Sequence, residues 1–291
     1  MRILGIVGSR RKMGNTEILV KETLLGARDE GADVALVRLT DLCLEECNGC
    51  MACVMRDARC GLKDDFYFLM EQMEAAEGMV LGAPTYIYAP AGIIKVLLDR
   101  FLVMKPDQWQ DKRAVTIATA GRKEWMPYVL PQLNCLAMMA GYGVVGSYVG
   151  ESPGPGEILL KEGAMADVRE LGRRLAHSIR GQEVVAPAPG TYTQCPICSS
   201  SHFEIDSATE VTCAMCRAHG RIVAGNGKAA IQFDREGLAA HRFTPEAKAE
   251  HLIGWIKSTG PVFQTKFKDV QERRQPYKDL DIPWLTPPGA A

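Results

Sequence analysis

The sequence lacks long apolar runs and has almost no net charge. Of its 291 residues, 34 are Lys or Arg and 35 are Asp or Glu, which leaves a formal net charge of −1. This balance provides no broad basic field for nucleic acid or anionic lipid, so we expect neither as a partner. No stretch approaches the roughly 20 apolar residues that a membrane helix needs. The sequence therefore favours small molecules or proteins as partners and predicts no membrane association.

A secretory signal is also missing from the first residues. The apolar run from Ile3 to Val7 is too short for one and ends at a glycine-rich turn. We therefore expect a protein of a reducing compartment, with a cytoplasmic location. With 47% hydrophobic residues, the chain is long enough for one substantial core and a smaller appended unit.

Cysteine, in contrast, is abundant for such a compartment. Eight of the ten cysteines fall into two groups, and only Cys43 and Cys135 stand apart. Three cysteines at a repeat of three, with a fourth close behind, place four thiolates within reach of one centre, as a cubane iron–sulfur cluster requires. The alternative is a set of bare redox or structural thiols, since disulfide frameworks belong to small secreted domains. This first group comprises Cys47, Cys50, Cys53 and Cys60.

The second group forms two CxxC pairs separated by fourteen residues, with strand-like segments between them. Four thiolates at this spacing suit tetrahedral coordination and predict a closed, structural zinc ribbon. Rubredoxin-like iron is the competitor, but Ser199 and Arg217 stand where a rubredoxin knuckle usually carries glycine. His202 and His219 lie nearby, although four cysteines already fill the coordination shell. The predicted ligands are Cys195, Cys198, Cys213 and Cys216.

Strand-like and helical segments alternate through the first 180 residues. Strands joined by helices of this length need right-handed crossovers, which predicts a doubly wound α/β fold with a five-stranded parallel sheet. We expect strands at 2–7, 33–39, 78–82, 114–118 and 144–149, and helices at 15–27, 64–76, 90–102, 127–140 and 157–179.

The loop after the first strand has the chemistry of a phosphate site. It offers backbone N–H groups, hydroxyls and positive charge at a helix N-terminus. The spacing fits neither the dinucleotide fingerprint nor a Walker loop, so a terminal monophosphate, as on FMN, suits it better. A merely solvated basic turn is the alternative. The predicted cofactor-binding residues here are Ser9, Arg10, Arg11, Gly14, Asn15 and Thr16.

Two further loops should meet the first at the carboxyl edge of the sheet. One offers backbone groups and tyrosine rings to an isoalloxazine, and the other closes its far side. Tyr86 and Tyr88 could instead be ordinary core or interface aromatics. The candidate residues are Pro84, Thr85, Tyr86, Ile87 and Tyr88 in one loop and Thr119, Ala120, Gly121 and Arg122 in the other.

Together with the 83–86 loop, Leu98-Asp99-Arg100 and the cysteine motif, the segment 8–16 resembles the iron–sulfur flavoproteins of the NADPH-dependent FMN reductase family, in the flavodoxin-like superfamily. The resemblance covers roughly residues 1–180. It implies a flavodoxin-like sheet, FMN on the three loops, a [4Fe–4S] cluster on the first cysteine group and electron transfer between them in a homodimer or homotetramer. Arg10 stands where proline is usual. The gap before Cys60 is longer than the family's compact form, so Cys43 is an alternative fourth ligand.

The remaining chain divides by composition. We predict a linker at 181–192, the zinc ribbon at 193–224 and a C-terminal extension at 225–291 with one helix at 244–258. Thr244 and Pro245 provide the cap and first residue of that helix. The sequence after Gly260 is polar and proline-rich and predicts no further element.

These features together predict a redox flavoprotein. It would pass electrons between NAD(P)H or a ferredoxin-type donor, FMN, the cluster and a small-molecule or protein acceptor. The alternatives are a cluster-free NAD(P)H:quinone or flavin reductase and a redox-sensing zinc-ribbon interaction protein. Arg56 and Arg59 are either counter-charges to the cluster or solvated side chains. No side chain stands out as a catalytic acid or base.

Overall fold

The computed structural model describes residues 1–182, 187–225, 228–283 and 285. Its N-terminal part is built on a parallel sheet with the strand order β2-β1-β3-β5-β6, the doubly wound order in which the chain switches direction between β1 and β3. The predicted flavodoxin-like five-stranded sheet is therefore confirmed. The strands are β1 (Arg2–Val7), β2 (Asp33–Arg38), β3 (Gly78–Tyr86), β5 (Arg113–Ala120) and β6 (Gly143–Glu151), with the short β4 (Ala89–Pro90) antiparallel to β3.

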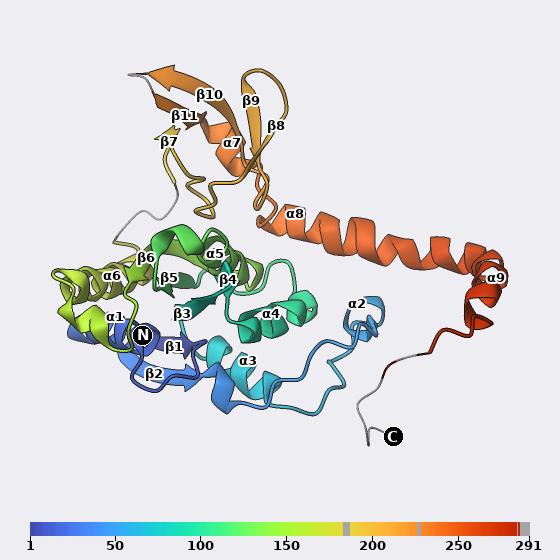
Figure 1. Cartoon of the computed structure of the whole chain (residues 1–291), viewed down its shortest axis with the longest axis horizontal. Helices are drawn as coiled ribbons and strands as arrows, with labels where there is room; N and C mark the ends of the chain where they lie inside the picture. Colours follow the sequence, from blue (N-terminus) through green and yellow to red (C-terminus); the bar gives the residue numbers. More distant parts are fainter. Residues whose placement is uncertain (183–186, 226–227, 284, 286–291) are drawn as a thin grey trace.

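Helices cover both faces of this sheet, and neighbouring strand residues point to opposite faces. Ile3 and Val7 pack with the helices α1 and α6, while Leu4 and Ile6 pack with α3, α4 and α5. Each face is thus closed by its own apolar cluster (Figure 1). The helices are α1 (Asn15–Asp29), α3 (Phe66–Glu74), α4 (Gly92–Asp99), α5 (Val129–Met139) and α6 (Ala164–Ile179), and the short turns are η1 (Leu39–Asp41), α2 (Ala52–Met55), η2 (Phe101–Val103), η3 (Lys123–Trp125) and η4 (Glu157–Leu160).

Two predicted segments differ from the observed ones for local reasons. The predicted helix at 157–179 is interrupted, because Gly163 adopts a φ of +76° and starts α6 anew after η4. The predicted loop at 84–88 is largely extended backbone: β3 continues to Tyr86 and returns as β4. Ile87 and Tyr88 form the turn with φ values of 44° and 68°.

A second, antiparallel sheet follows with the order β7-β11-β10-β9-β8. Figure 1 shows it as a separate layer above the parallel sheet, on the side of α5. Its strands span residues 190–233, beyond both ends of the zinc ribbon predicted at 193–224. Residues 183–186 of the predicted linker lie outside the described residues. The elements are β7 (Gly190–Tyr192), β8 (Phe203–Ile205), β9 (Glu210–Cys213), β10 (His219–Gly225), β11 (Lys228–Phe233) and α7 (Arg235–Ala239).

The chain ends in a long helical tail, α8 (Pro245–Ala249), a π-helical segment η5 (Glu250–Lys257) and α9 (Ser258–Lys278). The prediction of a helix that stops near residue 258 is wrong. Pro261 lies inside this continuous helical run, and the helix continues past it to Lys278 although proline has no N–H to donate.

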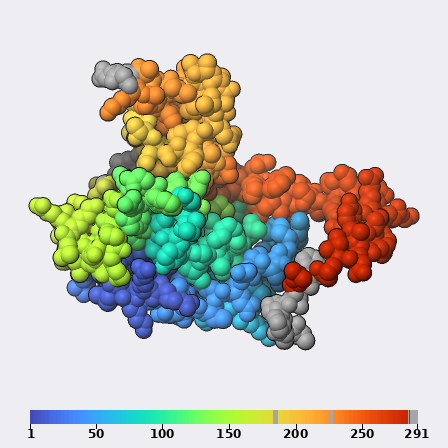
Figure 2. Space-filling view, viewed as in Figure 1, coloured from blue at the N-terminus to red at the C-terminus, as the bar shows by residue number. Residues whose placement is uncertain are grey.

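The base of this tail touches the cysteine loop, since Lys257 Nζ pairs with Asp57 at 2.6 Å. Figures 1 and 2 show that the remainder of α9 extends away from the sheets. Among the described helices, none is both long and apolar enough to cross a membrane.

Candidate functional site

The loop after β1 forms a small polar cavity of about 80 Å³ at the N-terminus of α1. The N-cap, Gly14, has no side chain that could bind the first N–H groups of the helix, so these donors remain for an anion. Arg10 and Arg11 are both exposed, and of the two only Arg11 lines the cavity. The lining residues are Ser9, Arg11, Gly14, Asn15, Thr16, Pro84, Thr85, Tyr86, Thr119, Ala120, Gly121, Ser152, Pro153 and Pro155.

Two predicted phosphate ligands in this cavity use their side chains for protein contacts. Asn15 Nδ2 donates to the carbonyl oxygens of Ser152 and Gly154 at 3.2 and 2.9 Å. Thr16 Oγ1 shares a buried hydrogen bond of 2.7 Å with Thr119 Oγ1. These side chains therefore hold three loops together, and the backbone of α1 supplies the donors that remain for an anion.

We call this cavity the cradle. Glu17, a residue that the sequence did not single out, lies next to it in the first turn of α1. Its buried carboxylate accepts a hydrogen bond from the Met13 N–H at 2.7 Å and pairs with Lys21 and Arg38 at 2.6 and 2.7 Å. Burial raises the pKa of Glu17, but the hydrogen bonds from Lys21 and Arg38 outweigh it and lower that pKa to about 2. Arg38 also pairs with Asp41 at 3.3 Å, so two carboxylates balance these two cations, and the positive charge at the cavity itself comes from Arg11.

A wider groove of about 480 Å³ adjoins the cradle, and four residues line both. Its wall carries Tyr88 stacked on Trp125, with ring centroids 5.2 Å apart and nearly parallel planes. Tyr86 is 50% exposed and Tyr88 42%, so neither ring belongs to the core. Positive φ at the β-branched Ile87 is an uncommon, strained conformation of the kind that collects at ligand sites. The groove is lined by Thr85, Ile87, Tyr88, Ala120, Gly121, Arg122, Trp125 and Pro153.

The cradle and the groove together offer what an FMN needs: N–H donors and positive charge for its phosphate, and an apolar aromatic wall for its ring. Trp125 and the 152–155 turn were missed by sequence reasoning. A lone tryptophan after the fourth long strand gives no local signal of its position, and the turn reaches the site only through the fold.

The first cysteine group lies on the long connection between η1 and α3. Cys47 and Cys50 are exposed, while Cys53 and Cys60 are partly buried. Burial raises the pKa of Cys53, and the nearby thiolates of the other three raise it further. The four thiols of the predicted group thus lie on one loop, but within the described residues no three of them meet the mutual 4.8 Å separation that gathers the second cysteine group.

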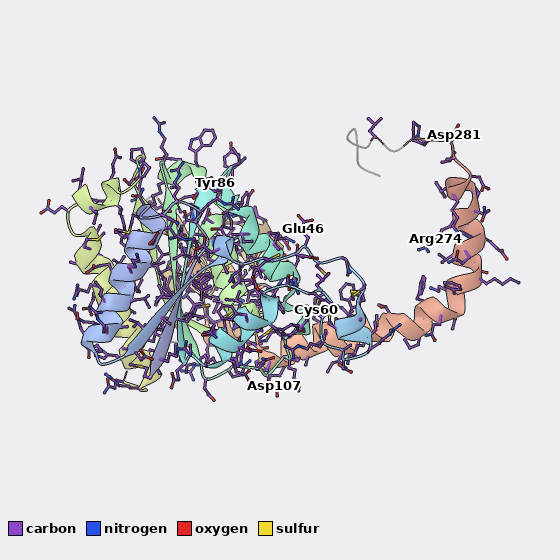
Figure 3. All side chains as sticks on the ribbon, turned by 90° about the horizontal axis from the view of Figure 1, so that it is seen from below. Glu46, Cys60, Tyr86, Asp107, Arg274 and Asp281 are labelled. Carbon is purple, nitrogen blue, oxygen red and sulfur yellow. The ribbon has the colours of Figure 1, made fainter. Side chains whose placement is uncertain are left out.

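Cys60 is the most firmly held of these four. Its N–H donates to Tyr67 Oη at 2.7 Å, and Arg100 Nη2 lies 3.4 Å from its Sγ. Arg100 also pairs with Asp64, and both side chains are almost fully buried. The N–H of Cys43, the alternative ligand, donates to Asp65 Oδ2 at 2.7 Å. Figure 3 shows Cys60 between the parallel sheet and the tail helices.

The two arginines inside the motif point elsewhere. Arg56 is exposed, and Arg59 stacks over the Tyr67 ring at 3.8 Å and reaches Glu71 at 4.0 Å. The cation beside the cysteine loop's sulfur is Arg100, which follows α4 forty residues later in the sequence. Spacing within the motif could not have identified it.

The second cysteine group is a compact, buried set. Cys195, Cys198, Cys213 and Cys216 have sulfur atoms within 4.8 Å of one another, as ligands of a single ion require. Ser199 and Arg217, the residues after each CxxC, have left-handed φ values of 63° and 70°. Among the described residues, this group does not include His202, which stacks on Tyr128, or His219, which contacts Thr212 Oγ1 at 2.9 Å.

One buried side chain ties this site to the parallel sheet. Asn134 of α5 donates to the carbonyl oxygen of Cys198 and to Ser199 Oγ, both at 3.1 Å. Its own carbonyl oxygen accepts a hydrogen bond of 2.6 Å from Thr116 in β5. The first knuckle of the ribbon is therefore connected to the sheet that carries the groove.

A flavodoxin-like sheet with an anion cradle and an aromatic groove at its carboxyl edge defines a flavin-binding redox protein. Residues 1–152 match the family model of NADPH-dependent FMN reductases, just over half of the chain. The chain belongs to this family and is an FMN-dependent oxidoreductase.

Two curated relatives extend the comparison. An iron–sulfur flavoprotein of Methanocaldococcus jannaschii is 28% identical over 190 residues, which cover 62% of this chain and 98% of the relative. A flavone synthase of Aspergillus candidus is 29% identical over 286 residues, 87% of this chain and 88% of the relative. A solved structure named flavone reductase shares the fold over 99% of this chain and 100% of its own, with a TM-score of 0.78 and 23% identity.

Proposed function

We propose that this oxidoreductase holds FMN in the cradle and groove and a [4Fe–4S] cluster on Cys47, Cys50, Cys53 and Cys60. Electrons would pass between NAD(P)H or a ferredoxin-type donor and an acceptor through both groups. The observation that carries the proposal is the position of α4. This helix of eight residues begins directly after the β3–β4 hairpin, whose turn lines the groove. It ends next to Arg100, which contacts Cys60, and it spans roughly 12 Å at 1.5 Å per residue.

The two groups complement each other chemically, because a flavin accepts a hydride and releases electrons singly, whereas a cluster carries one electron. The side chains of the protein bind and orient. The α1 N-terminus with Ser9 and Arg11 would hold the phosphate, and the Ile87–Tyr88 turn would hold the ring. Four thiols on one loop, with a buried guanidinium on one of them, suit an anionic cluster.

Iron, zinc and flavin counts on anaerobically reconstituted protein test this proposal. We expect four iron, one zinc and one FMN per chain, the stoichiometry of these groups. Cys50→Ser should remove the iron and keep the FMN, with Cys135→Ser as the control that keeps both. Iron below about one atom per chain would refute the cluster and leave the cluster-free NAD(P)H reductase. Comparing Cys60→Ser with Cys43→Ser identifies the fourth ligand.

We further propose that the acceptor is a planar aromatic compound of the flavone type. The names of two nearly full-length relatives support this, as does Trp125, whose indole is 53% exposed on the wall of the groove and suits stacking of a fused ring. Anaerobic assays with reduced nicotinamide and a flavone should show a reduced product. Trp125→Ala should raise KM for the flavone more than for a small quinone, whereas equal effects on both would contradict the assignment.

For the ribbon, at residues 193–224, we propose a structural zinc ion. Four buried thiols around one point, with no open position among them, match a closed site. Metal analysis that finds iron in this site after selective removal of the cluster would favour the rubredoxin-like alternative.

We also infer a homodimer or homotetramer in which α9 packs against a second copy. Val262, Phe263 and Phe267 are each about half exposed on a helix that extends from the body, and an isolated helix of this kind is unstable in water. Light scattering on a chain truncated after Lys257 should give a smaller oligomer than the full chain. An unchanged mass would exclude this role of α9.

A further inference from the structure

Arg100 makes an unusual set of buried contacts. Its side chain is 1% exposed and that of Asp64 is 0%. Nη1 pairs with Asp64 and approaches the carbonyl oxygen of Glu45 at 3.4 Å, while Nη2 lies 3.4 Å from Cys60 Sγ. The guanidinium covers the Phe66 ring at 4.2 Å. The remaining donor, Nε, is buried without a partner in the described part of the chain.

These contacts are costly if they serve the fold alone. Taking a carboxylate and a guanidinium out of water costs several kcal/mol per ion, and an orphaned N–H adds to that cost. Arg100 and Asp64 neutralise each other's charge. The hydrogen bond from Arg100 Nη2 to the sulfur of Cys60 is made in addition to this ion pair. A neutral thiol is a weak acceptor, whereas a metal-bound thiolate is a strong one, and charge-assisted bonds are about twice as strong as neutral ones.

The same pair fixes both ends of the cysteine loop. Asp64 accepts hydrogen bonds from the N–H groups of Glu45 and Phe66, at 2.8 and 3.2 Å. Glu45 precedes Cys47, and Asp64 follows Cys60. Arg100 directly follows α4, and the other end of α4 directly follows the β3–β4 hairpin at the groove. One buried ion pair therefore joins the loop to the helix that leads to the groove.

We propose that Arg100 is a positioning residue of the iron–sulfur site that holds Cys60 and raises the reduction potential of the cluster through its bond to that sulfur. The role rests on the proposed function, because it requires a cluster on the first cysteine group. The physical reason is that reduction adds a negative charge to the cluster, and a buried cation donating to a ligand sulfur stabilises the reduced form.

Arg100→Lys is the main variant. Lysine keeps the charge that Asp64 needs, but as a point charge it loses the planar fork that reaches both partners. We expect the cluster to remain and its reduction to become about tenfold less favourable, which for one electron is about 59 mV. The measurement is a redox titration of reconstituted protein followed by electron paramagnetic resonance, which does not depend on turnover. Arg59→Gln is the matched control, because it removes an exposed charge from the same loop, and we expect a shift below about threefold.

Asp64→Asn tests whether a change in the reduction potential comes from the bond between Arg100 and the sulfur or from a general distortion of the loop. It keeps the donors of Arg100 and removes their counter-charge, so the potential should rise, opposite to Arg100→Lys. A fall in both variants, or an iron-loaded Arg100→Lys protein with an unchanged potential, would overturn the role of Arg100. Loss of iron from Arg100→Lys while Arg59→Gln keeps four iron atoms would support its hold on Cys60. Wild-type protein without iron would instead refute the proposed function.

Discussion

The two cysteine sites of this chain are built in different ways. The ribbon site gathers four fully buried sulfur atoms within 4.8 Å, on knuckles held by backbone hydrogen bonds such as that from the Ser199 N–H to the Cys195 carbonyl at 2.8 Å. The loop site keeps Cys47 and Cys50 exposed and relies on the remote pair Arg100–Asp64.

This difference separates a site that stabilises the fold from one suited to exchange with partners. Buried thiolates need a compensating ion, so the ribbon and its metal should fold together. An exposed loop would give a redox partner access to the proposed cluster, but it needs outside support to keep its shape. Here that support is electrostatic, and it comes from Arg100 at the end of α4, the helix beside the proposed flavin groove.

The largest expected effect is the loss of the ribbon metal. Cys198→Ser should remove the zinc and unfold the second sheet, since structural zinc contributes about 10 kcal/mol in small zinc domains. Thermal denaturation and a zinc count measure this. Cys50→Ser should leave the melting temperature nearly unchanged while iron is lost. Equal destabilisation by the two variants would remove the distinction between the sites.

Removing the cation of the loop site should come next. Arg100→Met leaves Asp64 buried without its partner, and such breaks cost about 3 to 5 kcal/mol. Chemical denaturation checks the value, with Arg59→Met as a surface control expected within about 0.5 kcal/mol. A loss below about 1 kcal/mol would mean that the pair behaves like an exposed one.

Glu17 tests whether charge also supports the flavin cradle. Its folded-state pKa of about 2 lies below the ordinary value of 4.5, so its stabilisation is complete above pH 4.5 and is lost as the pH falls through 2. At neutral pH the contribution is at most about 3 kcal/mol. Unfolding of the wild type and Glu17→Gln should therefore converge toward pH 2. Curves that remain parallel from pH 5 to 2 would contradict this assignment.

The smallest expected effect concerns the contact between the two parts. Asn134→Ala removes both bonds to the first knuckle and the carbonyl oxygen to which Thr116 and Ser147 donate, which should cost about 2 kcal/mol. Denaturant unfolding measures it, with Gln132→Ala on the same helix as control. Zinc should stay bound, because no ligand changes; zinc loss would show that the knuckle depends on α5.

The sequence by itself determined the features that arise within a few residues of each other. Buried strands with turns at their ends predicted the five strands of the parallel sheet, and β1 was placed at Arg2–Val7 as observed. The CxxC spacing predicted the second cysteine group, because a knuckle is a local turn. The glycine-rich turn before α1 predicted a site at that helix N-terminus, where the structure has a polar cavity, and its binding of an anion stays a prediction.

The tertiary structure alone decided which distant side chains meet. It turned Asn15 and Thr16 toward other loops, placed Trp125 against Tyr88, continued the tail helix past Pro261 and brought Arg100 to Cys60. Periodicity and spacing report on neighbours along the chain. The partner of a buried charge is selected by packing between elements, where forty residues of sequence separate a guanidinium from the sulfur that it contacts.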